Sequence, residues 1–189
     1  MNDARAAKRP EKSARRVAPP LDEAGLRALA LGYAARFATT RVRLARYLAR
    51  KVQERGWDGP HPADIDALID RLATLGYVDD AAFAAMKGRA MAARGLGQRR
   101  VSEALSAAGV AVADRGAAPG RADMLATAVA FARRKRIGPY APAGNDDPKR
   151  REKALAAMLR AGHAMDIARR VLGAGSPEAA EALIAGEAD

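Results

Sequence analysis

Residues 75–84 read LGYVDDAAFA, and the adjacent aspartates Asp79 and Asp80 admit two interpretations. They could form a catalytic carboxylate pair, or they could mark the start of a helix. A catalytic pair normally needs a pocket and a further group such as histidine, lysine or a metal, and the neighbouring sequence offers none. An aspartate at a helix start accepts hydrogen bonds from free backbone N–H groups, which stabilises the helix by about 0.5–2 kcal/mol. We therefore expect a cap here, before a helix with Phe83 and Met86 on its apolar stripe, and no catalytic site.

A glycine ends the predicted helix before this pair, and the same kind of ending occurs at three other places. At each place an apolar or ring-bearing residue follows the glycine: Gly56–Trp57, Gly76–Tyr77, Gly109–Val110 and Gly162–His163. Glycine adopts the left-handed backbone conformation past a helix end without a Cβ clash, and the next side chain can fold back onto the last turn, as in a Schellman cap. Four such endings predict one helical design used repeatedly.

Apolar residues recur with the spacing of amphipathic helices along most of the chain, as in segments 41–55, 63–75, 98–108 and 149–162. Their separations of three, four and seven residues place them on one helix face. No segment shows the alternation that is typical of a half-buried strand. The sequence therefore predicts an all-α fold.

Composition excludes several kinds of site. The 189 residues contain no cysteine, so disulfides, thiolate zinc sites and cysteine nucleophiles are excluded. His61 and His163 are isolated histidines without spaced acids, so we expect neither a metal site nor a cofactor. No run of about 18 apolar residues predicts a membrane span, and no apolar segment follows the basic N-terminus as in a secretory signal. A cytoplasmic protein is expected.

Three segments align with one another: TRVRLARYL at 40–48, GQRRVSEAL at 97–105 and HAMDIARRVL at 163–172. Apolar residues match at two positions four residues apart in each segment, which indicates a weak internal repeat of the length that helical arrays show. The expected fold is an elongated array of three tandem three-helix units after a flexible arm. The predicted parts are a disordered basic arm broken by prolines (1–20), a first helical repeat (21–60), a second (61–111), a linker (112–121), a third repeat (122–175) and a C-terminal tail (176–189).

The central segment, together with RGLGQRRVSEALSAAGV at 94–110, resembles the RecX family of recombinase regulators, and the resemblance extends from about residue 28 to about residue 172. The family pattern joins a Gly-Tyr-aliphatic-Asp-Asp-x-x-Phe-Ala core to a basic, glycine-containing turn and a helix that ends in glycine and an aliphatic residue. In this sequence the pattern falls on Gly76, Tyr77, Val78, Asp79, Asp80, Phe83, Ala84, Gly95, Gly97, Arg100, Leu105, Gly109 and Val110.

The resemblance implies tandem three-helix units, and the sequence pattern leads us to expect a monomer without a cofactor. The resemblance also implies a partner, the RecA recombinase filament, whose groove the protein would occupy to modulate and mainly inhibit its activity in recombination, DNA repair and the SOS response. Two departures affect partner contacts. Arg43 stands where the first unit of the family often carries an acid, and residues 160–163 lack the Arg-Gly-Phe that often precedes the last helix.

Positive charge is clustered on the predicted helices, and the net charge of +11 favours a polyanionic partner. The residues that we expect to contact a nucleoprotein are Arg41, Arg43, Arg46, Arg50, Lys87, Arg89, Arg94, Arg99 and Arg100. These residues could instead be solvated helix faces. The eight aromatic residues are dispersed along the sequence, which argues against a stacking platform for single strands.

Three functions remain open from the residues alone. The first is a regulator that binds the recombinase filament together with its DNA. The second is a direct DNA-binding protein of the helix-turn-helix class, which would bind single- or double-stranded DNA largely without regard to sequence. The third, an enzyme using Asp79 and Asp80, is the least supported.

Overall fold

The computed structural model describes residues 18–142 and 147–187, and within these ranges the protein is helical. The all-α prediction is confirmed. The predicted disordered arm at 1–20 lies outside the described residues except for its last three. The helices are α1 (Glu23–Arg36), α2 (Arg41–Arg55), α3 (Ile65–Thr74), α4 (Asp80–Ala93), α5 (Gln98–Ala107), α6 (Arg121–Lys135), α7 (Pro148–Arg160), α8 (Met165–Leu172) and α9 (Pro177–Ala185), with short 3-10 turns η1 (Val112–Arg115) and η2 (Gly138–Tyr140).

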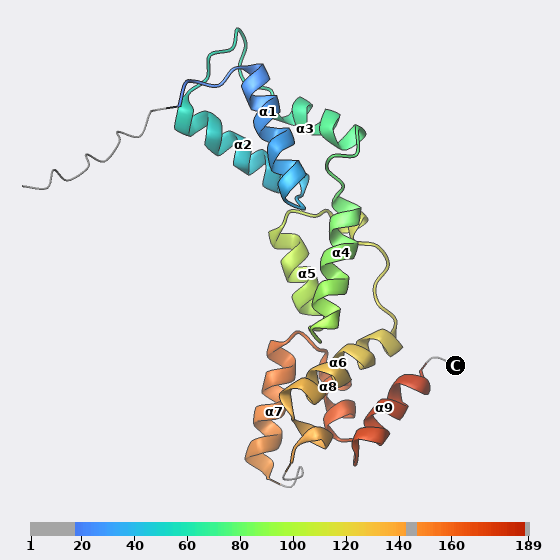
Figure 1. Ribbon diagram of the computed structural model, residues 1–189. Helices are drawn as coiled ribbons and strands as arrows, with labels where there is room; N and C mark the ends of the chain where they lie inside the picture. The colour runs from blue at the N-terminus through green and yellow to red at the C-terminus, as the bar shows by residue number, and fades with distance from the viewer. Residues whose placement is uncertain (1–17, 143–146, 188–189) are drawn as a thin grey trace, which may run out of the picture.

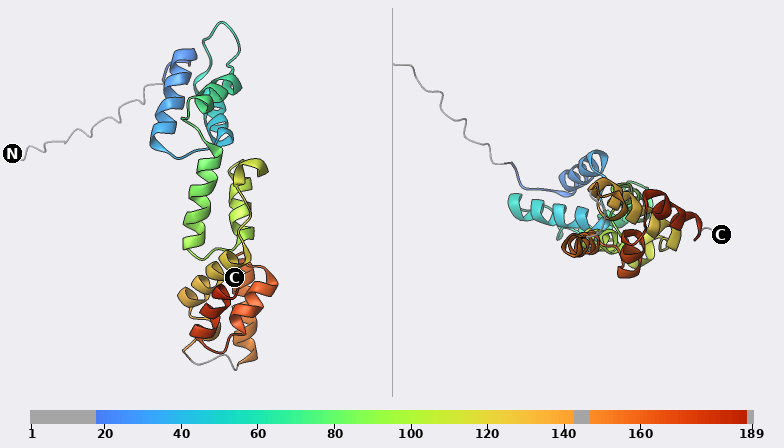
Figure 2. Two further views of the ribbon diagram at one scale, coloured as in Figure 1. Left: turned by 90° about the vertical axis from the view of Figure 1, so that its right-hand side faces the viewer. Right: turned by 90° about the horizontal axis from the view of Figure 1, so that it is seen from below.

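The helices form an elongated column (Figure 1). Helices α1, α2 and α3 lie at one end, the antiparallel pair α4 and α5 forms the middle, and α6 to α9 form the other end. Seen along the column, α2 extends past the outline of the lower helices (Figure 2). The column gives the protein a long surface to which several helices contribute.

Buried apolar side chains fall into three separate clusters. The first joins α1, α2 and α3, and it includes Leu44, Leu48 and Leu72. The middle cluster between α4 and α5 is smaller and centres on Phe83 and Leu105. The third, between α6 and α9, has the most members. The division into units at the predicted boundaries stays a prediction.

The predicted glycine endings are present, with one difference. Gly76, Gly109 and Gly162 have φ values of +76°, +79° and +94°, and the residue after each donates its N–H to a carbonyl five residues back, as a Schellman motif requires. Gly56 also has positive φ, at +82°, but no such bond follows it. Its neighbour Trp57 instead pairs with the extended backbone before α1.

Two Schellman endings are additional to the predicted four. Leu96 N–H donates to the Met91 carbonyl at 3.0 Å after Gly95, which has a φ of +65°. Ile137 N–H donates to the Ala132 carbonyl at 3.0 Å after Arg136. Within the described residues, Arg136 is the one non-glycine residue with positive φ, at +52°.

The stretch predicted as a C-terminal tail contains a packed helix, α9. Ser176 caps this helix by accepting a hydrogen bond from the Ala179 N–H, and Ala180 is fully buried in the third cluster. Alanine side chains carry little hydrophobic signal, so the sequence pattern did not reveal this helix. The predicted linker likewise contains η1, where the Arg115 guanidinium donates to the Val110 carbonyl.

Candidate nucleoprotein-binding surface

The two aspartates of the central motif have separate structural roles. Asp79 is the N-cap of α4, where its carboxylate accepts a hydrogen bond from the Ala82 N–H at 2.8 Å. Asp80 is the first residue of α4, and its carboxylate accepts a hydrogen bond from the Arg41 N–H, at the start of α2, at 2.9 Å. An anion is favourable at the positive end of a helix dipole, and Asp80 lies at two such ends. Asp79 therefore caps α4, and Asp80 joins the start of α4 to the start of α2.

The α5–α2 junction joins the end of α5 to the start of α2. The buried Thr40 hydroxyl donates to the Ala108 carbonyl at 2.6 Å and accepts from the Arg43 N–H at 3.2 Å. A Cβ at Gly109 would lie 2.4 Å from the Val42 Cβ, so only glycine fits there. The Arg43 guanidinium lies 5.3 Å from the centre of the Phe83 ring, at a cation–π distance.

The α7–α5 junction joins the end of α7 to the start of α5 through the backbone. The N–H groups of Gly97 and Arg99 donate to the carbonyls of Ala161 and Gly162 at 2.9 and 3.2 Å. The negative end of the α7 dipole thus meets the positive end of α5. A Cβ at Gly97 would lie 2.3 Å from the Gly162 carbonyl carbon, which requires glycine at this position.

His163 supports this junction from inside. Its ring is 5% exposed, it packs against Phe131, and its Nε2 lies 3.1 Å from the Gly95 carbonyl oxygen. Because a carbonyl oxygen only accepts hydrogen bonds, Nε2 carries the proton. Burial lowers the pKa of His163 below its usual value of 6.5, and the bond to Gly95 opposes that shift in part.

Four of the nine predicted contact residues are held by internal ion pairs or hydrogen bonds. Arg41 pairs with Asp70 at 3.0 Å, and Arg50 lies 3.6 Å from Glu54. The guanidinium groups of Arg99 and Arg100 donate to the α7 carbonyls of Leu159 and Arg160, and both also pair with Glu103. Arg99 and Arg100 therefore stabilise the α7–α5 junction. Their partners lie 60 residues away in sequence, so spacing gave no sign of them.

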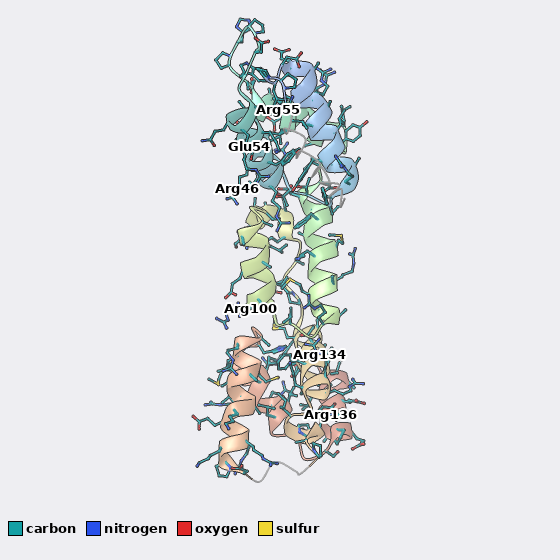
Figure 3. The ribbon with its side chains drawn as sticks, turned by 60° about the vertical axis from the view of Figure 1, so that its left-hand side comes forward. Arg46, Glu54, Arg55, Arg100, Arg134 and Arg136 are labelled. Atoms are coloured by element: carbon teal, nitrogen blue, oxygen red, sulfur yellow. The ribbon has the colours of Figure 1, made fainter. Side chains whose placement is uncertain are left out.

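The side chains of four other predicted residues have neither an ion pair nor a hydrogen bond with any described residue. They are Arg46, Lys87, Arg89 and Arg94. Arg46 lies on α2, and its side chain extends outward on the same side of the column as that of Arg100 (Figure 3). The other three lie on or directly after α4. These four cations are free to bind a partner, whereas Arg43 is engaged with Phe83.

Three aromatic side chains from the end of α1 and the middle of α2 meet, although the aromatic residues are dispersed along the sequence. Tyr33 and Tyr47 stack with ring centres 4.3 Å apart, and Phe37 lies 5.1 Å from Tyr33. The fold brings them together because α1 and α2 pack side by side, which places the end of α1 against the middle of α2. We call these three residues the aromatic row.

Among the described residues, no group of three or more histidine, aspartate and glutamate side chains could hold a metal ion. No helix there is long and apolar enough to cross a membrane.

The described residues form an elongated helical column that carries unpaired cations, and comparison with known proteins places the chain among regulatory proteins. The chain is 32% identical to the regulatory protein RecX of Myxococcus xanthus over 173 residues, which cover 85% of this chain and 89% of the relative. It is 30% identical to the Agrobacterium fabrum RecX over 148 residues, 76% and 79% of the two chains. It is 37% identical to the Acidithiobacillus ferrooxidans RecX over 130 residues, 69% and 79% of the two chains.

No family model matches the sequence. The length and identity of these alignments are nevertheless sufficient to assign the chain. It belongs to the RecX family of regulatory proteins.

Proposed function

We propose that the protein binds the RecA filament on DNA and inhibits its activity in recombination and repair, acting in the cytoplasm by binding rather than by catalysis. Family membership supports the regulatory role. The observation that carries the mode of binding is the set of unpaired cations, Arg46, Lys87, Arg89 and Arg94, which is spread over α2 and α4. Cations distributed along a column suit an extended polyanion, because each neutralised phosphate releases condensed counterions.

A helix-turn-helix mode of DNA binding is less well supported. Such proteins place the N-terminal residues of a recognition helix against base edges in the major groove. The start of α5 is covered by the end of α7, and the start of α2 is joined to α5 by Thr40. The start of α8 carries Asp166. A hydrogen bond from the Ile167 backbone N–H and the nearby Arg121 guanidinium both lower the pKa of Asp166, so this helix start is negatively charged. The starts of α2 and α5 are thus engaged with other helices of the protein, and the start of α8 carries a negative charge.

A titration with bare and RecA-coated single-stranded DNA at matched salt tests the proposal. We expect tighter binding to the coated strand, since the filament adds protein surface to the phosphate contacts. Replacing Arg46, Lys87, Arg89 and Arg94 with glutamate should weaken binding about equally for all DNA sequences. It should also flatten the log–log salt dependence by roughly one unit per lost phosphate contact.

The matched control replaces four other unpaired cations, all on α7, with glutamate: Lys149, Arg151, Lys153 and Arg160. This variant has the same change in net charge, so it should keep most of the affinity if contacts are local to α2 and α4. Equal losses in the two variants would mean that net charge alone drives binding. Equal affinity of the wild-type protein for bare and coated strands would contradict the recombinase proposal.

A further inference from the structure

The aromatic row is more exposed to solvent than an ordinary packing contact in a core. Phe37 ends the row with its side chain 55% exposed, and the rings of Tyr33 and Tyr47 are half-buried. The hydroxyl groups of both tyrosines have no hydrogen-bond partner among the described residues, and neither is buried without one. They therefore face solvent. The row presents ring surface and polar edges on the outside of α1 and α2.

Cations of α2 lie beside the row. The Arg50 guanidinium carbon lies 5.8 Å from the centre of the Tyr47 ring, and the Lys51 ammonium lies 6.0 Å from it. Residues three or four apart share one face of a helix, so Arg46, Arg50 and Tyr47 lie along neighbouring lines on α2. Glu54 pairs with both Arg50 and Lys51 and offsets one charge. The three cations and Glu54 leave the face with a net positive charge, and Arg46 has no described partner.

We propose that the aromatic row and the α2 cations form a binding site for single-stranded nucleic acid. In this site bases stack on Phe37 and on the exposed edges of the tyrosine pair, while Arg46, Arg50 and Lys51 contact phosphates. Rings beside cations are the combination that recognises single strands, because every base has a π-face and stacking is tolerant of sequence. In a duplex the bases stack on one another, so their faces are not available to the aromatic rings. The site acts on bare strands, so it does not depend on the recombinase contact proposed above.

Fluorescence anisotropy with a labelled oligothymidine tests the site, using Phe37→Ala as the main variant. Loss of one stacked base should weaken binding roughly 5-fold or more. Tyr77→Ala is the matched control, because Tyr77 is also 55% exposed but lies outside the row. We expect it to bind like the wild type. Phe37→Leu keeps the apolar bulk and should lose affinity as Phe37→Ala does, whereas Phe37→Trp keeps a ring and should retain binding.

An abasic strand of the same length separates stacking from phosphate contact. The wild type should bind it at least as weakly as Phe37→Leu binds oligothymidine, because the abasic strand also lacks the bases that stack on the tyrosines. Wild type and Phe37→Leu should bind the abasic strand equally. Equal affinities of wild type and Phe37→Leu for oligothymidine would overturn the proposal. So would a Phe37→Leu defect of the same size on the abasic strand, or a defect that appears only with recombinase-coated strands, since the latter would assign the row to a protein contact.

Discussion

The two junctions of the column connect helices in different ways. At the α7–α5 junction the backbone of one helix end bonds directly to the backbone of the next, and Gly97 leaves the space for it. At the α5–α2 junction the hydroxyl of Thr40 makes the connection, and the carboxylate of Asp80 joins the start of α4 to the start of α2. Thr40 and Gly97 occupy the same position in the aligned segments. Side-chain size at this single position therefore sets how closely two helix ends approach.

The largest effect is expected from a substitution that disrupts the α7–α5 junction. Gly97→Ala places a Cβ 2.3 Å from the Gly162 carbonyl carbon, and because neither backbone can move freely we expect a loss of about 3 kcal/mol in the free energy of unfolding. Gly120→Ala is the matched control. Gly120 is also an N-cap glycine with ordinary φ, at −64° against −74° for Gly97, and its Cβ would meet nothing closer than 3.8 Å.

Urea unfolding of both variants measures the difference. If Gly97→Ala were no less stable than Gly120→Ala, the close approach of α7 and α5 would not be a feature of the folded protein.

A smaller effect is expected from breaking the side-chain junction. Thr40→Val keeps the shape of the side chain but leaves the buried Ala108 carbonyl without its donor, and should cost about 2 kcal/mol. Arg100→Met removes a donor from the α7–α5 junction at an exposed site, and should cost less than about 1 kcal/mol because water replaces it. Thermal unfolding compares the two, and a larger loss for Arg100→Met would reverse our assignment of which junction depends on a side chain.

The buried His163 at the α7–α5 junction predicts that the free energy of unfolding depends on pH. Burial lowers the pKa of His163 in the folded protein, so in the window below 6.5 the unfolded chain binds more protons. The contribution to stability is therefore fully present above pH 6.5 and falls as the pH drops through that window. His163→Gln should lose this part of the pH dependence, while His61→Gln, in an exposed loop, should keep it.

Denaturant unfolding across a pH series checks the two variants against the wild type. Parallel curves for the wild type and His163→Gln would show that the ring does not titrate in the folded protein in the way its burial requires.

One expected effect is a gain in stability. Arg136 holds the left-handed conformation that glycine holds at the other Schellman endings, with a φ of +52°. Arg136→Gly relieves the Cβ clash and should raise the free energy of unfolding by about 1 kcal/mol. Arg134→Gly, inside α6, is the contrasting change and should lower it by about 1 kcal/mol. A melting temperature that falls for Arg136→Gly would mean that the arginine side chain makes a stabilising contact that outweighs its backbone strain.

Local features of the fold could be predicted from the sequence, and long-range ones could not. Glycine endings and the Asp79 cap depend on a few neighbouring residues, so Gly76, Gly109 and Gly162 were identified from the local sequence pattern. The helix ending at Arg136 was not predicted, because arginine rarely adopts the left-handed conformation found there. The bond from Thr40 to Ala108 spans 68 residues, and no spacing rule reaches that far.

The candidate surface shows the same limit. A run of arginines predicts positive charge but not which guanidinium groups are free, and Arg99 and Arg100 turned out to bond to α7. The aromatic row was missed for a related reason. Tyr33 and Phe37 are four residues apart at the end of α1, but only the packing of α1 against α2 brings Tyr47 to them.

The uneven size of the three buried clusters has a consequence for the order of folding. The cluster of α6 to α9 has 13 buried residues and that of α1 to α3 has 8, whereas the pair α4 and α5 has 5. So small a core does not offset the chain entropy of its own helices. We therefore expect the terminal regions to fold independently and the middle pair to condense between them. Its amides should be the first to exchange with solvent, although it lies at the centre of the molecule.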